Sequence, residues 1–142
     1  MALKIIDYGS PQYAQMLKLR DEILRKPLGL CFTKEELEKE KDYLLIGAYE
    51  DDKMLACCML VEDNPKTVRL RQMAVINDLQ GKGIGKALMQ FAENLARDRG
   101  YQKISMHARK NAIGFYEKMG YVKVGEEFQE ITIPHYLMEK KL

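Results

Sequence analysis

The chain has 142 residues, of which 46% are hydrophobic and 31% are charged, so a disordered chain is excluded. The 23 Lys and Arg residues against 21 Asp and Glu residues leave a formal net charge of +2, too small to indicate a nucleic-acid-binding protein. No apolar run approaches the roughly 18 residues of a membrane span, and the N-terminal apolar run is too short for a secretory signal. We therefore expect a single-domain cytoplasmic protein that binds neither nucleic acid nor membranes.

The cysteines and histidines form no metal-binding pattern. Cys57 and Cys58 are adjacent in an apolar run, the total of three cysteines is odd, and no CxxC is present. These features argue against a disulfide framework and against a metal site. We expect Cys57 and Cys58 to be core residues in a reducing compartment, and Cys31 to be the exposed thiol.

One strand and two helices are predicted before residue 43. Residues 3–6 are a short strand. Ser10 is a favourable N-cap followed by proline, and it opens a helix expected to run to about Arg25. A second, very polar helix over 33–41 opens with a capping box. The apolar positions that suggest the first helix are Ala14, Leu17, Ile23 and Leu24.

The hydrophobic period then changes to that of strands. Residues 43–50 and 54–62 are predicted to form a hairpin, and 67–75 to follow as a third antiparallel strand. In this third strand two sets of residues alternate, Val68, Leu70 and Gln72 against Thr67, Arg69, Arg71 and Met73. This alternation predicts a meander whose last strand presents two arginines on one face.

The second half of the chain alternates strands and helices. An amphipathic helix starting near residue 83 is the strongest pattern in the sequence. Its apolar positions are Ile84, Ala87, Leu88, Phe91, Ala92, Leu95 and Ala96. A strand over 103–108, a helix over 111–120, and strands over 121–124 and 131–140 follow. The order β-α-α-β-β-β-α-β-α-β-β predicts a mixed sheet with helices on its faces.

The stretch QGKGIGKALMQ (80–90) lies between a strand and this amphipathic helix. Glycines leave backbone N–H groups unobstructed, and a helix N-terminus flanked by two lysines favours an anion. A P-loop is excluded because Gln80 and Ala87 stand where it needs glycine and Ser or Thr. The dinucleotide fingerprint is excluded because, started at Gly81, it reaches Lys86 instead of glycine. A phosphate-bearing ligand and a ligand-free turn remain as alternatives.

Two motifs in this order resemble those of the GNAT acetyltransferase superfamily. The first is MAVINDLQGKGIGKALM (73–89), in which Gln80, Gly83 and Gly85 occupy the defined positions of [QR]-x-x-G-x-[GA]. The second is NAIGFYEKMGY (111–121), similar to an asparagine followed by FYEKxGF/Y. The resemblance covers nearly the whole chain and is weakest over residues 1–40. It implies an α/β (α+β) fold with a mixed, mostly antiparallel sheet of about six to seven strands and helices on both faces.

The resemblance also implies one N-acetyltransferase domain over residues 1–142 that uses acetyl-CoA as donor and no metal. Main-chain N–H groups of the glycine stretch would bind the coenzyme A diphosphate, assisted by the helix dipole. The preceding strand would offer its backbone to the pantetheine arm, and an N–H near Val75 would polarise the thioester carbonyl. The implied coenzyme-binding residues are Met73, Ala74, Val75, Gln80, Gly81, Lys82, Gly83, Ile84, Gly85, Lys86, Asn111 and Tyr116.

Acetyl transfer to an amine requires a polarised carbonyl, a neutral amine and a proton for the leaving thiolate. The family works by direct attack in a ternary complex, so a nucleophilic cysteine is not needed. Tyr116 matches the tyrosine that many relatives use as the acid, although packing on an apolar helix stripe is the alternative. His135 follows a proline in the last strand and is the candidate base facing the acceptor.

Other candidates for the base each have a structural alternative. Glu62 and Asp63 end a hairpin strand near the expected acceptor cleft, but a solvated pair ahead of a turn is favoured. His107 is suited to base work, but it alternates as a half-buried strand residue. A base that acts through water, with no single essential residue, is a further alternative.

The acceptor is not identified by the sequence beyond a small-molecule or peptide primary amine. A charged segment before a Pro/Gly break is expected to line the acceptor site, with an amphipathic surface helix as the alternative for each of Arg20, Asp21, Glu22, Arg25 and Lys26. A homodimer is expected only by analogy with the fold. The alternative functions are a catalytically silent coenzyme-A-binding regulatory module and an unrelated α/β nucleotide-binding domain.

Overall fold

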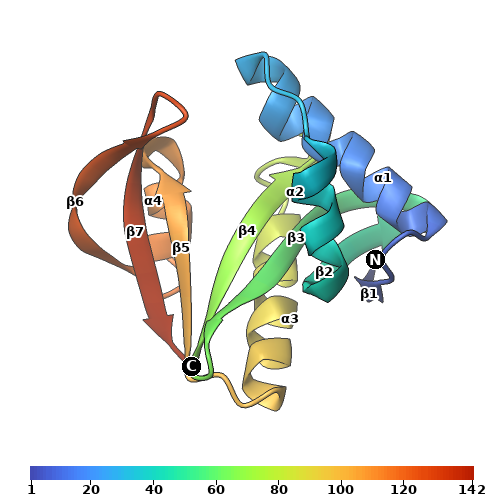
Figure 1. The fold of residues 1–142 in the computed structure, drawn as a ribbon. Helices are drawn as coiled ribbons and strands as arrows, with labels where there is room; N and C mark the ends of the chain where they lie inside the picture. The colour runs from blue at the N-terminus through green and yellow to red at the C-terminus, as the bar shows by residue number, and fades with distance from the viewer.

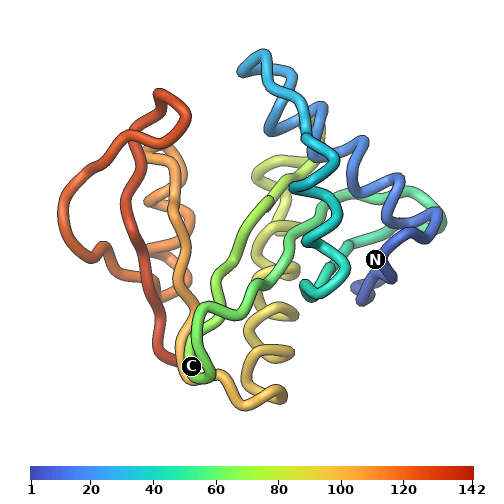
Figure 2. Tube along the Cα trace, viewed as in Figure 1, coloured from blue at the N-terminus to red at the C-terminus, as the bar shows by residue number.

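The computed structural model describes residues 1–142 and contains one seven-stranded sheet, seen in Figure 1 and as a trace in Figure 2. The strand order is β1-β2-β3-β4-β5-β7-β6, and all neighbours are antiparallel except β4 and β5. This confirms the expected mixed, mostly antiparallel sheet. The strands are β1 (Ala2–Ile6), β2 (Leu44–Glu50), β3 (Lys53–Asn64), β4 (Thr67–Val75), β5 (Lys103–Arg109), β6 (Val122–Glu130) and β7 (Ile133–Lys141).

Four α-helices cover the sheet, and none of them is both long and apolar enough to cross a membrane. They are α1 (Pro11–Arg20), α2 (Lys34–Lys39), α3 (Ile84–Asp98) and α4 (Ile113–Glu117). The predicted caps are present, since Ser10 Oγ and Thr33 Oγ1 each accept a hydrogen bond of 3.1 Å from a backbone N–H three residues later. The coil of α1 continues to Arg25 as a π-helical turn over Asp21–Arg25.

A hydrophobic core lies on each face of the sheet. The larger core joins α3 and α4 to β2–β5 and β7, and the smaller one joins α1 to β1–β4. Helices therefore cover both faces, as expected. The buried face of α1 differs from the prediction, because Tyr13, Met16, Leu19 and Arg20 point inward and Ala14 is exposed. Cys57 and Cys58 are buried in these cores and Cys31 is exposed, as the sequence predicted.

The strands β4 and β5 separate soon after they meet. They pair in parallel at three positions, from Thr67–Lys103 to Arg69–Ser105, and then diverge into the opening seen in the middle of Figures 1 and 2. From Leu70 to Val75, the edge of β4 that faces β5 has no strand partner. Because backbone N–H and C=O groups form hydrogen bonds wherever partners are available, this free edge is open to a ligand with amide groups.

A β-bulge in β4 lies at the centre of this opening. Gln72 has φ of +55°, and the register with β3 shifts between Met59, paired with Arg71, and Cys57, paired with Ala74. The extra residue exchanges the two faces of the strand, so Met73 packs with the same core as Leu70. The predicted alternation is therefore wrong beyond Arg71, because a bulge breaks the period of two.

Candidate active site

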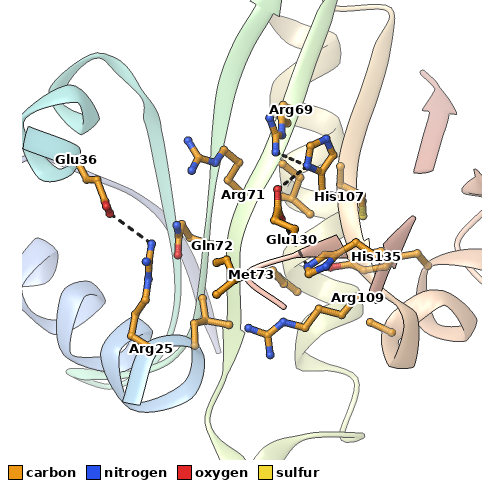
Figure 3. Close-up of a pocket in the computed structure, with 16 residues that line it drawn as sticks. Arg25, Glu36, Arg69, Arg71, Gln72, Met73, His107, Arg109, Glu130 and His135 are labelled. Atoms are coloured by element: carbon orange, nitrogen blue, oxygen red, sulfur yellow. Dashed lines mark hydrogen bonds and ion pairs between the residues drawn. The ribbon is translucent and has the colours of Figure 1, made fainter. Parts of the chain in front are cut away.

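A cavity of about 640 Å³ opens between the separated strands (Figure 3). Its walls come from the π-helical turn after α1, from α2, β4 and β5, from α4 and the turn before it, and from the β6–β7 hairpin. The lining residues are Leu24, Arg25, Glu36, Arg69, Leu70, Arg71, Gln72, Met73, Met106, His107, Arg109, Ala112, Tyr116, Glu130, Ile131 and His135. Its volume is that of a small-molecule binding site.

Unusual backbone conformations mark this cavity. Two of its lining residues, Gln72 and Ile131, are among the four non-glycine residues with positive φ, at +55° and +52°. A β-branched residue such as Ile131 rarely adopts this region. Strained backbone of this kind concentrates at functional sites, where the surrounding structure holds it in place. The positive φ angles and the position of the cavity therefore indicate the same site, which lies at the bulge of β4 and the tip of the β6–β7 hairpin.

His135 lies in the wall with a defined tautomer. Its side chain is 7% exposed, and its Nδ1 lies 2.7 Å from the carbonyl oxygen of Ile133. A carbonyl oxygen only accepts, so Nδ1 carries the proton and donates it. When the ring carries this one proton, its lone pair is on Nε2, which lies 3.6 Å from a carboxylate oxygen of Glu130. The ring also stacks on Phe128, with 5.9 Å between the ring centroids.

Glu130 links both histidines of the chain. Its Oε1 lies 2.9 Å from His107 Nδ1, and the same nitrogen lies 2.7 Å from Arg69 Nη2. Burial would raise the pKa of the Glu130 carboxyl, but the hydrogen bond from His107 and the charges of both histidines and Arg69 outweigh it, and the pKa lies below its ordinary value. Glu130 is therefore a carboxylate at neutral pH, beside the free Nε2 of His135.

Tyr116 lies in the second half of α4 and lines the cavity while most of its ring is buried. It packs edge-on against Phe115 and Tyr121, and its hydroxyl makes no hydrogen bond to the protein. Burial, and to a smaller degree the nearby Cys58 thiol, raise the pKa of Tyr116 above its ordinary value. The phenol therefore keeps its proton at neutral pH.

The glycine stretch forms a turn with open backbone N–H groups at the start of α3. Gly81 and Gly83 have φ of +82° and +85°, with open space where a Cβ would lie. The N–H groups of Gly81, Gly83, Ile84, Gly85 and Lys86 donate to no backbone or side-chain acceptor, whereas Lys82 N–H donates to Leu79 O. Five unpaired donors at the positive end of a 15-residue helix form a site for an anion.

Two features place this turn close to β4. Gln80 Nε2 donates to the carbonyl oxygen of Val75 at 3.0 Å, which ties the loop to the end of the strand. A Cβ on Gly85 would lie 3.2 Å from the ring of Phe115 and 3.4 Å from the side chain of Met73, so glycine permits close packing there. Lys82 and Lys86 are exposed and form no ion pair, so both remain available to a ligand.

The cavity is lined by only some of the predicted site residues, because Ala74, Val75 and residues 80–86 are not part of its lining. Met73, Tyr116, His107 and His135 line the cavity, and Asn111 lies exposed at the adjoining end of β5. Glu62 and Asp63 do not line it. Glu62 instead accepts a hydrogen bond of 2.8 Å from the Tyr101 hydroxyl at the closed end of the β4–β5 opening.

The charged segment before the Pro/Gly break is only partly in the wall. Arg25 lines the cavity, lies 3.5 Å from Glu36, and stacks over Phe32. Arg20 was expected to line the acceptor site, but it is completely buried and forms two hydrogen bonds, of 2.6 and 2.7 Å, with Glu40. Asp21 and Lys26 pair with each other at 3.6 Å and do not reach the cavity, and Glu22 does not line it either.

Several cavity residues were not predicted as site residues. Arg69 and Arg71 were visible as a pair on one face of the third strand of the meander, and that pattern was the available signal. Glu36, Arg109 and Glu130 had no such signal, because their approach to the cavity depends on α2 and on the β6–β7 hairpin folding over β4 and β5. No group of three or more His, Cys, Asp or Glu side chains is arranged to hold a metal ion.

Comparison with known families identifies the chain. Residues 28–142 match the acetyltransferase (GNAT) domain family. The chain belongs to the GNAT acetyltransferase family. Among curated relatives of this chain, YyaT of Bacillus subtilis (strain 168) is 32% identical over 76 residues, and N-acetyltransferase 8B of Homo sapiens is 33% identical over 104 residues. These matches cover 54% and 70% of this chain, but about half or less of the relatives, 51% and 42%.

A match over the full length is found with YjcF, an uncharacterized N-acetyltransferase of Bacillus subtilis (strain 168). It is 27% identical over 140 residues and covers 96% of this chain and 97% of YjcF. A Lactobacillus plantarum protein provisionally named as an N-acetyltransferase has a crystal structure that matches with a TM-score of 0.87 and 25% identity, covering 100% of this chain and 99% of that protein.

Two further solved structures share the fold at lower identity. An aminoglycoside 6'-N-acetyltransferase complexed with coenzyme A matches with a TM-score of 0.84 and 18% identity, covering 99% of this chain and 97% of that one. A GNAT family acetyltransferase from Elizabethkingia anophelis with acetyl-CoA bound matches with a TM-score of 0.75 and 19% identity, with the same coverage, 99% and 97%. Both confirm the GNAT fold of this chain.

Proposed function

We propose that this GNAT family member transfers an acetyl group from acetyl-CoA to a primary amine, by direct attack in a ternary complex. The observation that carries the proposal is the opening between β4 and β5 beside the unpaired N–H groups at the start of α3. Coenzyme A and acetyl-CoA are bound to two proteins of the same fold. We assign the activity to residues 1–142 as one domain in the cytoplasm.

The turn before α3 would hold the diphosphate of the coenzyme. Its five unpaired N–H groups suit an anion with several acceptor oxygens, and the helix dipole adds to their attraction. The positive φ of Gly81 and Gly83 turns these groups outward without a side chain in the way. The exposed Lys82 and Lys86 would add charge from either side.

The free edge of β4 would hold the pantetheine arm. An extended chain with amide groups can add to an unpaired strand edge as a further strand would. The edge from Leu70 to Val75 includes Met73, Ala74 and Val75, so a backbone N–H there would polarise the thioester carbonyl. Asn111 would contact the arm from the opposite wall, where β5 ends. The bulge at Gln72 directs this edge toward the cavity.

The chemistry then needs one base and one acid. The nitrogen of the neutral amine attacks the thioester carbon, and its surplus proton passes to His135 Nε2, whose lone pair is free because Nδ1 donates to Ile133. The carboxylate of Glu130 would stabilise the resulting imidazolium. As the carbon–sulfur bond breaks, the thiolate takes the proton of the Tyr116 hydroxyl, which has no other partner in the protein.

The proposal is tested first by binding. Calorimetric titration of the purified protein with acetyl-CoA and with ATP is expected to show binding of acetyl-CoA alone. A panel of primary amines, scored by thiol release from acetyl-CoA, then identifies acceptors. Binding of ATP without acetyl-CoA would contradict the coenzyme assignment. Binding of acetyl-CoA without thiol release from any amine would favour the catalytically silent coenzyme-A-binding module.

Replacing Tyr116 by phenylalanine is expected to lower kcat about 100-fold, which is within the range for loss of a general acid. The ring would keep its packing against Phe115 and Tyr121, because the substitution removes only the hydroxyl. The dissociation constant of acetyl-CoA should stay within about twofold of the wild-type value. Steady-state kinetics and calorimetry measure the two quantities. Tyr121→Phe is the control, since that hydroxyl bonds Glu93 outside the cavity; full activity of Tyr116→Phe would leave Tyr116 with a packing role.

A further inference from the structure

The charge of the cavity wall is positive. Four arginines line it, Arg25, Arg69, Arg71 and Arg109, against the two carboxylates of Glu36 and Glu130. These six side chains alone give the wall two more positive than negative charges, before either histidine is counted. A chain with a net charge of only +2 has concentrated an equal surplus in one cavity.

The arginines of the wall are not all paired with protein groups. Arg25 pairs with Glu36, and Arg69 contacts His107, but Arg71 and Arg109 form no hydrogen bond or ion pair. Figure 3 shows the Arg71 and Arg109 side chains from opposite walls of the opening, with no dashed line to either. The Nε of Arg69 is also buried without a partner. Guanidinium groups of this kind in a cavity are donors for planar or tetrahedral oxyanions.

The repulsion between two neighbouring arginines of β4 also favours a bound anion. Arg69 and Arg71 are two residues apart on the same face, because the bulge begins only at Gln72. Burial, and next the repelling charge of Arg71, lower the pKa of Arg69, and the charges of Glu130 and Asp63 offset only part of this. No carboxylate pairs with Arg71 to offset the repulsion. A bound anion would offset it.

Acetyl-CoA does not account for these arginines if the proposed function is correct. Its diphosphate would lie on the turn over 80–86, where five N–H groups and two lysines are available, and none of those residues lines the cavity. The pantetheine arm that would enter between β4 and β5 is uncharged. The surplus positive charge is therefore directed at the second substrate. A polycationic amine would be repelled by this wall.

We propose that the acceptor is an amine that also carries an oxyacid group, a carboxylate or a phosphate, and that Arg71 and Arg109 bind this group. This inference rests on the proposed function and names the acceptor class of the same site. The acidic group would hold the amine at a fixed distance from the thioester and His135. Arg71 and Arg109 act as specificity-determining residues, whereas Tyr116 and His135 act on the reacting atoms.

The test compares acceptors that differ only in the acidic group. Amino acids are assayed for thiol release from acetyl-CoA as free acids, as carboxamides and as decarboxylated amines, together with phosphoethanolamine against ethanolamine. At least one acid is expected to have a kcat/KM tenfold or more above its uncharged counterpart. Preference for free amino acids indicates a carboxylate, and preference for phosphoethanolamine indicates a phosphate. Equal or better use of the uncharged counterparts throughout would overturn the proposal.

Variants then locate the acidic group. Arg71→Gln and Arg109→Gln are each expected to raise the KM of the preferred acid about 10- to 100-fold and to bring the acid-to-amide ratio of kcat/KM toward one. The KM of acetyl-CoA should not change. Arg99→Gln is the matched control, because Arg99 is exposed, has no ion pair and lies past the far end of α3. Acid preference that persists in both variants would overturn the assignment of these arginines.

A direct binding measurement separates this inference from the proposed function. Thermal shift with each free acid and its amide, with and without coenzyme A, is expected to show stabilisation by the acid that is lost in Arg71→Gln. Stabilisation by an acid without acetyl-CoA binding would overturn the proposed function and retain the anion site. Acetyl transfer to uncharged amines with no stabilisation by any acid would retain the proposed function and overturn the anion site. Failure of every acid in both assays would overturn the anion site as well.

Discussion

Gly83→Asp is expected to weaken acetyl-CoA binding by about 100-fold, equivalent to about 2.8 kcal/mol. Gly83 is the N-cap of α3, with φ of +85° and open space at its Cβ position. Aspartate is a favourable N-cap, so its carboxylate would bind the N–H groups that we assign to the diphosphate. Its negative charge would also repel the ligand. The dissociation constant is measured by calorimetric titration with acetyl-CoA.

The matched control is Gly100→Asp, at the other end of the same helix. Gly100 has φ of +87° and equally open space, so the substitution carries the same backbone strain and the same charge. It lies far from the turn that we assign to the diphosphate. Gly100→Asp is expected to lose stability to urea as Gly83→Asp does, and to bind acetyl-CoA with the wild-type dissociation constant. Wild-type affinity in Gly83→Asp would refute the assignment of the turn.

Arg20→Met is expected to lower the free energy of unfolding by about 3–5 kcal/mol, the usual cost of removing one partner of a buried ion pair. Both nitrogens of the Arg20 fork contact Glu40, at 2.6 and 2.7 Å, and Tyr13 donates to the same carboxylate at 2.8 Å. Without Arg20, the Glu40 carboxylate stays buried with one hydrogen bond and no counter-charge. Urea denaturation measures the loss. It is a large part of the stability of a domain of this size.

Two further variants distinguish charge from packing. Arg20→Met combined with Glu40→Gln is expected to recover at least half of the loss, because neutral glutamine needs no counter-charge. Lys26→Met breaks the exposed pair with Asp21 at 3.6 Å and should cost less than about 1 kcal/mol. A loss below 1 kcal/mol in Arg20→Met would show that the pair is not needed. The buried pair fastens α1 to the segment after α2, and so fixes the wall that contains Arg25.

The glycine turn shows how far local sequence reaches. Gln80, Gly83 and Gly85 lie within six residues of one another, so their spacing is kept by any chain that turns from a strand into a helix there. The amphipathic period of α3 fixed where that helix starts. A glycine turn at the start of a helix, whose first N–H groups have no partner in the protein, could therefore be predicted without the tertiary structure.

The acceptor side of the cavity shows where local sequence stops. Glu130 meets His107 and His135 because β6 and β7 form a hairpin whose tip returns to β5. The π-turn and α2 bring Arg25 and Glu36 across from β4, although they are far from it in sequence. The bulge at Gln72 breaks the strand period, and no glycine or proline at that position indicates it in the sequence. None of these contacts leaves a local pattern.

The sequence by itself determined the order of the elements, the sheet with helices on both faces, the family resemblance and the buried Cys57 and Cys58 pair. These properties follow from hydrophobic periodicity and from motifs of a few adjacent residues. Only the tertiary structure decided that Arg20 is a buried anchor, that Glu62 lies outside the cavity, and that Arg71 and Arg109 line it without partners. Burial and pairing of a charged side chain depend on which distant segments pack around it, and that is a property of the folded chain.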